Sequence, residues 1–367
     1  MNPIRVAQVI GVACNGGVES VIMNYYRHVD KSKVQFDFLV ESESQIINKE
    51  EIEKMGGKVI IIPSYKNLRA YNKELKRIFK ENKYDIVHSN MNTLSVFPLR
   101  MAKKCGIKNR IAHSHSTSNK KEWKRNILKS LLKPFSKVYA TKYFACTEHA
   151  ARYQFGDKAV KNNKVTILNN GIEIEKFKYD KDIGSQMRNE LGLNDKFVVG
   201  HIGRFVQQKN HEFLIDAFYK VQEKIENSCL LLVGEGPLEE KIKEKAKMLK
   251  IEDKVYFSGC SNSPDKLYNA MDVFAFPSLY EGLGIVAIEA QCSGLPCLCS
   301  DNVPNDVDIS EFCKFIPLED SKWSDSIISS ALNKDKFKRG NVKLKNDNFD
   351  IVKLASFLEK QYEEICS

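Results

Sequence analysis

The sequence predicts an α/β protein made of two Rossmann-like domains, each with a doubly wound parallel sheet. A length of 367 residues exceeds one ordinary core and suits two domains of about 150–200 residues each. Short apolar runs alternate with helical patterns of about ten or more residues, which is typical of parallel βαβ units. This alternation occurs twice, on either side of a polar stretch at Glu173–Ile183 that we interpret as a linker.

The first series of elements occupies the amino-terminal half of the chain. Its strands are expected at Ile4–Ile10, Phe36–Val40, Lys58–Ile62, Ile86–His88, Arg110–His113 and Tyr143–Ala145. Helical periodicity lies between them, at Glu19–His28, Ala70–Glu81 and Val96–Cys105. The series ends at the turn signal of Asn170 and Gly171, because Asn-Gly readily supplies positive φ angles.

The second series repeats the pattern in the carboxyl-terminal half. Its strands are expected at Phe197–Ile202, Cys229–Val233, Val255–Phe257, Val273–Phe276 and Pro296–Leu298. Its helices are expected at Glu212–Lys224, Leu238–Leu249, Lys266–Ala270 and Ile285–Cys292. A last amphipathic pattern at Ile351–Ile365 predicts a closing helix.

We therefore divide the chain into residues 1–176 and residues 177–349. The closing helix, over residues 350–367, is expected to cross back and complete the first domain. Ligands of doubly wound sheets bind outside the carboxyl ends of the strands. With the two domains facing each other, the cleft between them is the expected active site.

The composition excludes several classes of protein. A hydrophobic fraction of 43% with 28% charged residues is that of a soluble globular protein. No apolar run reaches the roughly 18–20 residues of a membrane helix, and the amino terminus enters a strand without a secretory signal, so a cytoplasmic location is expected. The ten cysteines include no Cys-x-x-Cys pair, which predicts reduced thiols and no metal site. The net charge of +10 is compatible with nucleic acid, anionic lipid or phosphorylated ligands.

The strongest functional pattern follows the predicted strand Val273–Phe276. There, Glu281–Gly284 leads directly into the helix Ile285–Cys292, which carries Glu289. A helix start favours an anion through its free N–H groups and dipole, and glycine lets a ligand approach closely. One carboxylate before a phosphate site and another beyond it suit a diphosphate with hydroxyls on both sides, such as a nucleotide sugar. The alternative is a surface loop with a capping glutamate and a solvated helix face.

Three further patterns follow strands. Arg204 and Lys209 come directly after Phe197–Ile202, where a planar guanidinium and a compact ammonium can neutralise a diphosphate; a solvent-facing basic loop is the alternative. Gly234 follows the next strand and fits either tight packing or contact with a nucleotide. In the first domain, a glycine pair lies between the first strand and the first helix, without the spacing of a dinucleotide fingerprint. That pair consists of Gly16 and Gly17.

Two histidines end the predicted strand Arg110–His113. His113 and His115 are two residues apart, so they share one face of the strand near the expected cleft. One of them is positioned to stabilise charge or contact a reacting sugar. A zinc site would need further ligands that the sequence does not place.

Taken together, these motifs resemble the retaining glycosyltransferase family 4, whose members have the two-domain GT-B fold. The resemblance covers nearly the whole chain and is closest to bacterial exopolysaccharide and capsule enzymes. One departure is Asn305 after Pro304, where related polysaccharide enzymes often have a glutamate. The matching positions are Gly16, Gly17 and Glu19; Asn170 to Phe177; Gly203, Arg204 and Lys209; Gly234 and Gly236; and Glu281, Glu289, Ala290, Gly294 and Pro296.

The resemblance implies a role for each matching residue. Arg204 and Lys209 would bind the donor diphosphate, Glu281 the donor sugar hydroxyls and Glu289 the ribose. His115 matches the active-site histidine of the family better than His113. Backbone contacts with the donor would come from Gly203, Gly234, Gly282, Leu283 and Gly284, and from Gly16 and Gly17 of the acceptor-side domain.

The activity implied is transfer of a hexose or N-acetylhexosamine, with retention, from a UDP-sugar to a glycan acceptor. The acceptor would be lipid-linked and the product an exopolysaccharide or capsule. Positioning and electrostatics would supply most of the catalysis through a front-face displacement. Two Asp-x-Asp patterns, at Asp180–Asp182 and Asp306–Asp308, lie in polar segments, and we predict no required metal or other cofactor.

The stretch Lys120–Lys142 combines eight basic residues with one acid, Glu122. Apolar residues recur at helical spacing within it, so it predicts peripheral contact with an anionic membrane surface at the inner face of the cell membrane. The alternative is a helix that packs on its own domain. The basic residues are Lys120, Lys121, Lys124, Arg125, Lys129, Lys133, Lys137 and Lys142.

Two other functions are compatible with parts of the pattern. A nucleotide-sugar 2-epimerase would share the frame, and an assay without any acceptor separates it from a transferase. A nucleic-acid-binding or noncatalytic glycan-binding protein would use the basic face. Because the basic charge lacks the interleaved aromatics of a stacking platform, we expect no nucleic-acid partner.

Overall fold

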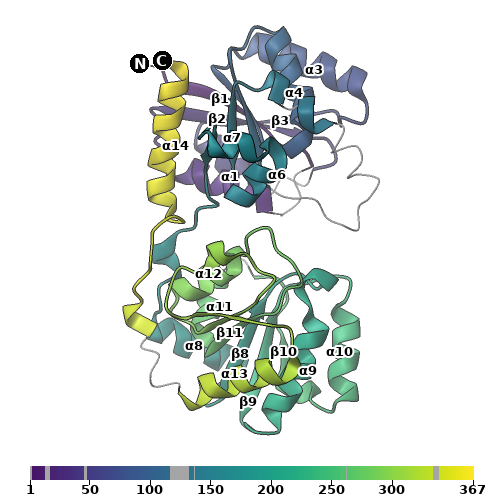
Figure 1. The fold of residues 1–367 in the computed structure, drawn as a ribbon, viewed down its shortest axis with the longest axis vertical. Helices are drawn as coiled ribbons and strands as arrows, with labels where there is room; N and C mark the ends of the chain where they lie inside the picture. Colours follow the sequence, from purple (N-terminus) through teal and green to yellow (C-terminus); the bar gives the residue numbers. More distant parts are fainter. Residues whose placement is uncertain are drawn as a thin grey trace. The chain divides into compact units, whose positions relative to one another are not determined.

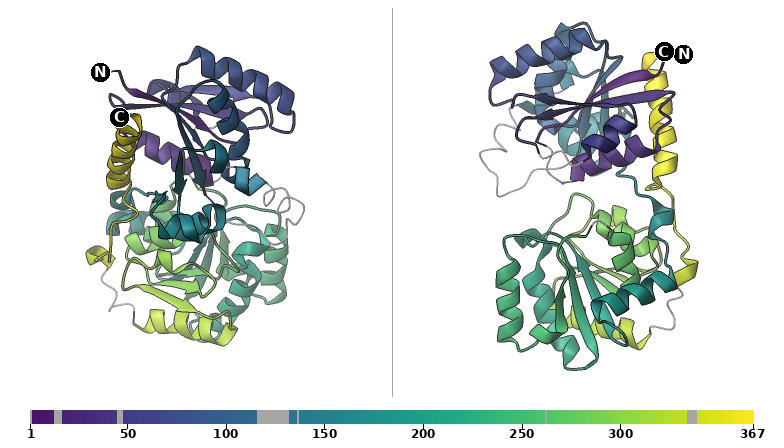
Figure 2. Two further views of the ribbon diagram at one scale, coloured as in Figure 1. Left: turned by 45° about the horizontal axis from the view of Figure 1, so that its top comes forward. Right: turned by 180° about the vertical axis from the view of Figure 1, so that it is seen from behind.

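The computed structural model describes residues 2–12, 17–44, 48–115, 132–135, 137–261, 263–333 and 339–367. The chain divides into two compact units (Figure 1). Unit 1 comprises Met1–Ile172 and Asn348–Ser367, and unit 2 comprises Glu173–Asp347. Each unit is an α/β structure with its own parallel sheet and helices on both of its faces (Figures 1 and 2).

Unit 1 contains a seven-stranded parallel sheet in the order β3-β2-β1-β4-β5-β6-β7. The order reverses between β1 and β4, which is where ligands bind in sheets of this type. Its strands are β1 (Ile4–Val9), β2 (Val34–Glu41), β3 (Lys58–Ile62), β4 (Ile86–Ser89), β5 (Asn109–Ser114), β6 (Lys142–Ala145) and β7 (Val165–Ile167). Its helices are α1 (Gly17–His28), α2 (Lys49–Lys54), α3 (Leu68–Glu81), η1 (Asn92–Ser95), α4 (Val96–Lys104), α6 (Glu148–Phe155), α7 (Asp157–Lys161) and α14 (Ile351–Cys366).

The last helix, α14, belongs to the core of unit 1, as the amphipathic pattern predicts. Its buried residues Ile351, Ala355, Leu358 and Tyr362 join the apolar cluster under α1. Figures 1 and 2 show α14, in yellow, alongside the strands and helices of the amino-terminal part of the chain. Burial of such a stripe stabilises unit 1 through a segment that lies far away in the sequence.

Unit 2 contains a six-stranded parallel sheet in the order β10-β9-β8-β11-β12-β13, with the reversal between β8 and β11. Its strands are β8 (Phe197–Ile202), β9 (Ser228–Val233), β10 (Val255–Phe257), β11 (Val273–Phe276), β12 (Cys297–Ser300) and β13 (Cys313–Ile316). Its main helices are α8 (Lys181–Leu191), α9 (His211–Gln222), α10 (Glu239–Met248), α11 (Pro264–Ala270), α12 (Ile285–Cys292) and α13 (Asp320–Leu332). Short helical turns are η2 (Ile174–Phe177), η3 (Gln207–Lys209), η4 (Glu252–Lys254), η5 (Asn305–Val307) and η7 (Arg339–Asn341).

The predicted fold class is confirmed, since both units have Rossmann-like parallel sheets. The interpretation of Glu173–Ile183 as a linker is wrong, because this stretch contains η2 and the start of α8. Asp180 caps α8, accepting hydrogen bonds from the N–H groups of Asp182 and Ile183 at 2.8 and 3.1 Å. The helix looks polar in sequence because Gly184 is its only buried residue.

The division between the two units falls between Ile172 and Glu173, four residues before the boundary that we predicted. Several strands and helices escaped prediction, namely β7, β13, α2, α6, α7 and α13. The two strands are short edge strands whose side chains are mostly only partly buried. Among the described residues, no helix is both long and apolar enough to cross a membrane.

Candidate functional site

The reversal point of unit 2 brings together two of the predicted motifs. The loop after β8 carries Gly203–Lys209, and the loop after the adjacent strand β11 carries Glu281–Gly284. A backbone hydrogen bond from the N–H of Leu279 to the carbonyl of Gln208, at 2.8 Å, joins the two loops. Residues more than 70 positions apart in the sequence therefore form one edge of the unit.

The centre of this edge is an ion pair between Lys209 and Glu281. Nζ of Lys209 donates a hydrogen bond to Oε1 of Glu281 at 2.7 Å. The side chains are 16% and 8% exposed, so neither charge is fully hydrated. The ammonium also lies 4.6 Å from the centre of the Phe276 ring. This pairing holds a positive charge in a fixed place at the end of the sheet.

Arg204 lies on the same loop but is arranged differently. Its side chain is exposed, and it makes no ion pair or side-chain hydrogen bond within the part of the chain that the structure describes. The five N–H donors of a guanidinium match the oxygens of a phosphate group. Arg204 therefore offers an unoccupied anion-binding group beside the occupied Lys209.

The start of α12 provides a third source of positive potential. Gly284 precedes the helix with φ of +98°, and a Cβ atom there would lie 2.9 Å from the ring of Phe276. In the described part of the chain, the N–H groups of residues 282 to 286 have no hydrogen-bond acceptor. A Cβ atom on Gly282 would meet nothing within 4 Å, so a ligand can reach this backbone. Leu283, by contrast, is 5% exposed and packs inward.

Glu289 lies one turn inside α12 and is half-buried. The hydroxyl of Tyr268 donates a hydrogen bond to its Oε2 at 2.8 Å. Burial raises the pKa of Glu289 to about 7, and this effect exceeds the lowering by Tyr268 and Lys176. The carboxyl group is thus poised to change its charge near neutral pH, unlike the solvated glutamate of the alternative interpretation.

Two of the predicted glycines touch each other. Gly234 has φ of +136°, and a Cβ atom there would lie 2.3 Å from the carbonyl oxygen of Gly203. Its own N–H donates to the carbonyl of Gly259 at 2.9 Å. A Cβ atom on Gly203 would lie 3.0 Å from Nε2 of His201 and 3.2 Å from two side-chain carbons of Lys209. Close packing of the loops after β8 and β9 is enough to explain Gly234.

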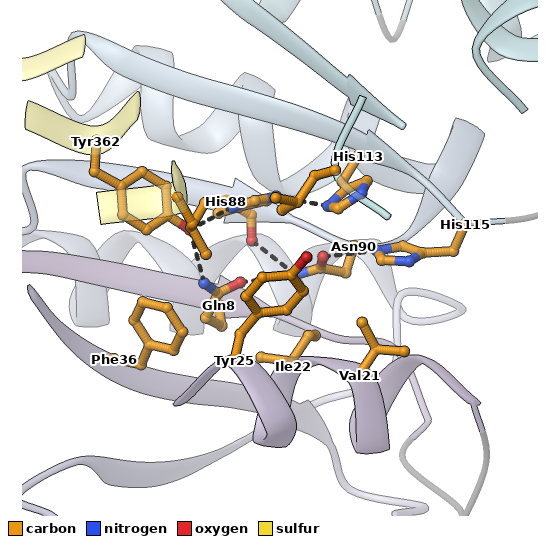
Figure 3. Close-up of a pocket in the computed structure, with 12 residues that line it drawn as sticks. Gln8, Val21, Ile22, Tyr25, Phe36, His88, Asn90, His113, His115 and Tyr362 are labelled. Carbon is orange, nitrogen blue, oxygen red and sulfur yellow. Dashed lines mark hydrogen bonds between the residues drawn. The ribbon is translucent and has the colours of Figure 1, made fainter. Parts of the chain in front are cut away.

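Unit 1 carries a chain of buried polar groups at the carboxyl ends of β1, β4 and β5 (Figure 3). Nε2 of Gln8 donates to the hydroxyl of Tyr362 at 3.1 Å, which leaves the proton of this hydroxyl for Nδ1 of His88 at 2.7 Å. His88 then carries its proton on Nε2 and donates to Nδ1 of His113 at 3.0 Å. The proton of His113 is left on Nε2, which is buried and has no partner among the described residues.

His115 is held by two asparagines that follow β4. Its N–H donates to Oδ1 of Asn92 at 2.7 Å, and its Nε2 pairs with Oδ1 of Asn90 at 2.9 Å. The amide of Asn90 donates to Oε1 of Gln8 at 2.9 Å, so Nε2 of His115 is the donor and its Nδ1 is a free acceptor. The rings of His113 and His115 lie 3.9 Å apart between centres.

Burial keeps these histidines neutral. It lowers the pKa of His88 and of His115 to about 3 each, and that of His113 well below its usual range. Together with Tyr25 and Leu168, these residues line a cavity of about 10 Å³, which is room for one water molecule. The edge of unit 1 is therefore rich in hydrogen-bonding groups but carries no histidine charge at neutral pH.

Comparison with known proteins assigns the chain to a protein family. A family model described as "Glycosyltransferase Family 4" matches residues 15–176, and one described as "Glycosyl transferases group 1" matches residues 185–311. A chain of Bacillus subtilis named as the glycosyltransferase EpsF is 35% identical over 338 residues, covering 89% of this chain and 88% of its own length. The chain belongs to glycosyltransferase family 4.

Two further similarities agree with that assignment. An Escherichia coli relative is 27% identical over 307 residues, covering 78% of this chain and 77% of its own length; it is named UDP-Gal:alpha-D-GlcNAc-diphosphoundecaprenol alpha-1,3-galactosyltransferase. The crystal structure of HepE from Anabaena in complex with UDP superposes with a TM-score of 0.81, covering 98% of this chain and 100% of that one at 18% identity. The fold is thus GT-B, and the protein is a glycosyltransferase.

Some predicted positions of this family 4 enzyme lie outside the described residues. Gly16 is among them, and Gly17 is the first residue of α1. Most of the basic stretch Lys120–Lys142 is outside as well, because residues 116–131 and 136 are not described. In the part that is described, Nζ of Lys137 donates to the carbonyl of Phe155 at 2.6 Å, and Phe135 and Val138 are 53% and 60% exposed.

The structure also assembles a thiol cluster that the sequence did not suggest. Pairing of β12 with β13 places Cys313 opposite Cys297, and the sulfur atoms of Cys297, Cys299 and Cys313 lie within 4.8 Å of one another. The cysteines that are described are all free of disulfides. Cys313 went unnoticed because β13 was not predicted.

Sequence reasoning missed the polar partners in unit 1. Gln8, His88 and Tyr362 belong to a strand, a second strand and the last helix, so no local spacing connects them. A signal did exist, because His88 and Asn90 follow one another at the end of an apolar strand. Only the topology, which places β4 beside both β1 and β5, shows that they act together.

Proposed function

We propose that the enzyme transfers a hexose or N-acetylhexosamine from a UDP-sugar to a lipid-linked glycan acceptor, with retention of the anomeric configuration, in exopolysaccharide or capsule synthesis. The observation that carries the proposal is the combination of the Lys209–Glu281 pair, the unoccupied Arg204 and the free N–H groups that start α12. The ammonium of Lys209, the guanidinium of Arg204 and the start of α12 all belong to loops at one sheet edge. A diphosphate is the ligand that uses all three.

The proposed roles follow from the position of each group. Arg204, Lys209 and the N–H groups of Gly282, Leu283 and Gly284 bind the diphosphate. Glu281 accepts hydrogen bonds from hydroxyls of the donor sugar while it stays paired with Lys209. Glu289, one turn further along α12, accepts the ribose hydroxyls. Gly203 and Gly234 shape the loops, and for Gly16 and Gly17 we propose only the role that the resemblance implies, contact with the donor phosphates.

A UDP-sugar is the donor that the relatives favour. The name of the E. coli relative specifies UDP-galactose and an acceptor carried on diphosphoundecaprenol. The HepE crystal structure, which shares only the fold at 18% identity, contains UDP. We extend this chemistry to the present enzyme as part of the proposal.

The proposed mechanism relies on positioning and charge. Arg204 and Lys209 stabilise the diphosphate as it leaves, and the departing phosphate takes the proton of the attacking acceptor hydroxyl on the same face of the sugar. The neutral His115 contacts the reacting sugar through its ring nitrogen. Fixed donors aimed at developing charge supply most of the acceleration in such reactions. No metal or other cofactor is part of this proposal.

A lipid-linked acceptor would bring the enzyme to the membrane surface. The exposed Phe135 and Val138 lie in the described part of the basic stretch and support peripheral contact there. Equal binding of the enzyme to vesicles of neutral and of anionic phospholipid would contradict this contact. The rest of the proposal does not depend on it.

The proposed function is tested by a donor panel followed by a transfer assay. UDP-galactose, UDP-glucose, UDP-N-acetylglucosamine and GDP-mannose are first compared by thermal shift, because a bound donor stabilises the fold by mass action. The stabilising sugars are then incubated with N-acetylglucosamine linked through diphosphate to a short polyprenyl chain. Transfer from a UDP-sugar with retained anomeric configuration is expected. Conversion of the donor without any acceptor would instead indicate an epimerase.

A further inference from the structure

Two carboxylates on strand β2 have opposite surroundings. Asp37 and Glu41 are four residues apart, so they share a face of the sheet, and both side chains are fully buried. Asp37 accepts hydrogen bonds from the hydroxyl of Tyr84 at 2.9 Å and the N–H of Lys58 at 3.1 Å, and it pairs with Arg5. Neither carboxylate oxygen of Glu41 has a partner among the described residues.

An unpartnered buried carboxylate is costly, because a charge removed from water must be compensated by other groups. Structures that retain such a group generally do so at functional sites, where a ligand supplies the missing partners. The missing partners of Glu41 are not a property of β2 as a whole, because the buried carboxylate of Asp37 on the same strand has its hydrogen-bond partners. The difference between the two residues is their position along the strand.

Glu41 is the last residue of β2, at the edge where ligands bind in this fold. Its Oε1 lies under Gly11, the residue that follows β1 by two positions; a Cβ atom on Gly11 would be 3.9 Å from it. Further buried atoms without partners among the described residues occur elsewhere in unit 1. They belong to Glu19, Thr93, His113 and His115, while Gln154 and Asn170 also lack partners for one atom each.

The chemistry of these atoms narrows the ligand. A carboxylate has only acceptors, so the missing partner must present hydrogen-bond donors. Elsewhere near the carboxyl ends of β4 and β5, the hydroxyl of Thr93, Nε2–H of His113 and Nδ1 of His115 also lack partners and comprise donors and acceptors. Sugar hydroxyls, which donate and accept at once, complement such a set, whereas a phosphate group would repel Glu41.

We propose that Glu41 binds hydroxyl groups of the acceptor glycan and anchors it at the carboxyl edge of the unit 1 sheet. This inference rests on the proposed function, because it assigns the acceptor side of the same reaction. The burial of Glu41 then lowers the desolvation cost of binding, because the carboxylate has little bound water to lose when the acceptor hydroxyls bind. The acceptor replaces the partners that Asp37 obtains from the protein itself.

The test compares Glu41→Gln with Asp37→Asn, two isosteric changes on one strand. Glu41→Gln should raise the melting temperature by about 2–4 °C, because a buried carboxyl group without partners is replaced by a neutral amide. It should also lower kcat/KM for the diphosphate-linked N-acetylglucosamine acceptor roughly ten- to a hundred-fold, as expected for losing charge-assisted hydrogen bonds. Asp37→Asn should lower the melting temperature. The thermal shift produced by UDP should be the same in Glu41→Gln and in the unaltered enzyme.

A second variant places a methyl group next to the same carboxylate without changing Glu41 itself. In Gly11→Ala the new methyl group would lie 3.7 Å from Cε of Met91 and 3.9 Å from Oε1 of Glu41, which are ordinary contacts. The variant should therefore fold normally and raise the KM for the acceptor by covering Glu41. Unchanged acceptor kinetics in Glu41→Gln, or destabilisation like that of Asp37→Asn, would overturn this inference alone. Absence of transfer by the unaltered enzyme would overturn the proposed function and this inference with it.

Discussion

The reversal points of the two sheets are built on one topology but offer opposite chemistry. In unit 2 the edge is charged, with Lys209 paired to Glu281, Arg204 exposed and a helix start directed at the same place. In unit 1 the edge holds three neutral histidines and a carboxylate that has no partner among the described residues. We therefore propose that the edge of unit 2 binds the charged diphosphate and that the edge of unit 1 binds hydroxyl groups.

The largest effect is expected from removing the central charge of unit 2. Lys209→Ala should lower kcat at least about a hundred-fold, because it deletes a charge-assisted contact with the leaving group and leaves Glu281 buried without its partner. The matched control is Lys245→Ala, which removes a lysine of similar exposure, 21%, paired with Asp216. The measurement is the initial rate of transfer by each of the two variants. Equal, small losses would show that the Lys209 pair is only structural.

The glycines of unit 2 separate packing from ligand contact. Gly234→Ala should destabilise unit 2 by about 3 kcal/mol or more, because a Cβ atom at positive φ would collide with the carbonyl of Gly203. Gly282→Ala should change stability by less than about 0.5 kcal/mol, since its Cβ position is open, yet weaken UDP about ten-fold. Urea unfolding and calorimetry measure the two quantities. Loss of stability in Gly282→Ala would refute the distinction.

These two glycines also show how far sequence reasoning reaches. The motifs after β8 and β11 were predictable, because each follows an apolar strand at a position where parallel sheets bind ligands. That Gly234 packs on Gly203 was not predictable, since two loops must be superposed in space before the contact appears. Likewise, nothing in sequence distinguishes Glu41 from Asp37, because the partners of Asp37 come from β1, from β3 and from Tyr84, two residues before β4.

The pH dependence of donor binding tests the role of Glu289. Its pKa is raised to about 7 by burial, so in the free enzyme the carboxylate that accepts ribose hydroxyls is lost as the pH falls below 7. The affinity for UDP should drop about ten-fold between pH 8 and pH 6. Glu289→Gln should bind weakly at both values. A pH-independent affinity in the unaltered enzyme would contradict the assignment.

The same pKa shift makes an opposite prediction for stability. Because the folded-state pKa of Glu289 lies above its unfolded value, the folded state holds more protons between the two values. The stabilisation is fully present below about pH 4.5 and is lost as the pH rises through about 7. The free energy of unfolding of the unaltered enzyme, measured relative to that of Glu289→Gln, should therefore fall as the pH rises through this interval.

The smallest effect is expected in unit 1. Tyr362→Phe leaves Nε2 of Gln8 and Nδ1 of His88 without partners and should cost about 1–3 kcal/mol. Tyr26→Phe is the matched control, because its buried hydroxyl bonds to Gln35 in the same unit and does not touch the histidines. Only Tyr362→Phe should change the ¹⁵N chemical shifts that report the tautomers of His88 and His113. Identical histidine spectra in the two variants would show that the hydrogen-bond chain has no directing effect.

The most direct test of the division between the two edges is calorimetric titration of UDP into the unaltered enzyme and into Arg204→Ala. Arg204 is exposed and makes no ion pair in the described chain, so its removal should leave the fold intact. We expect micromolar binding of UDP to the unaltered enzyme and at least about ten-fold weaker binding to the variant, because a bidentate contact with the diphosphate is lost. Equal affinity for the two proteins would contradict the placement of the diphosphate at this edge of unit 2.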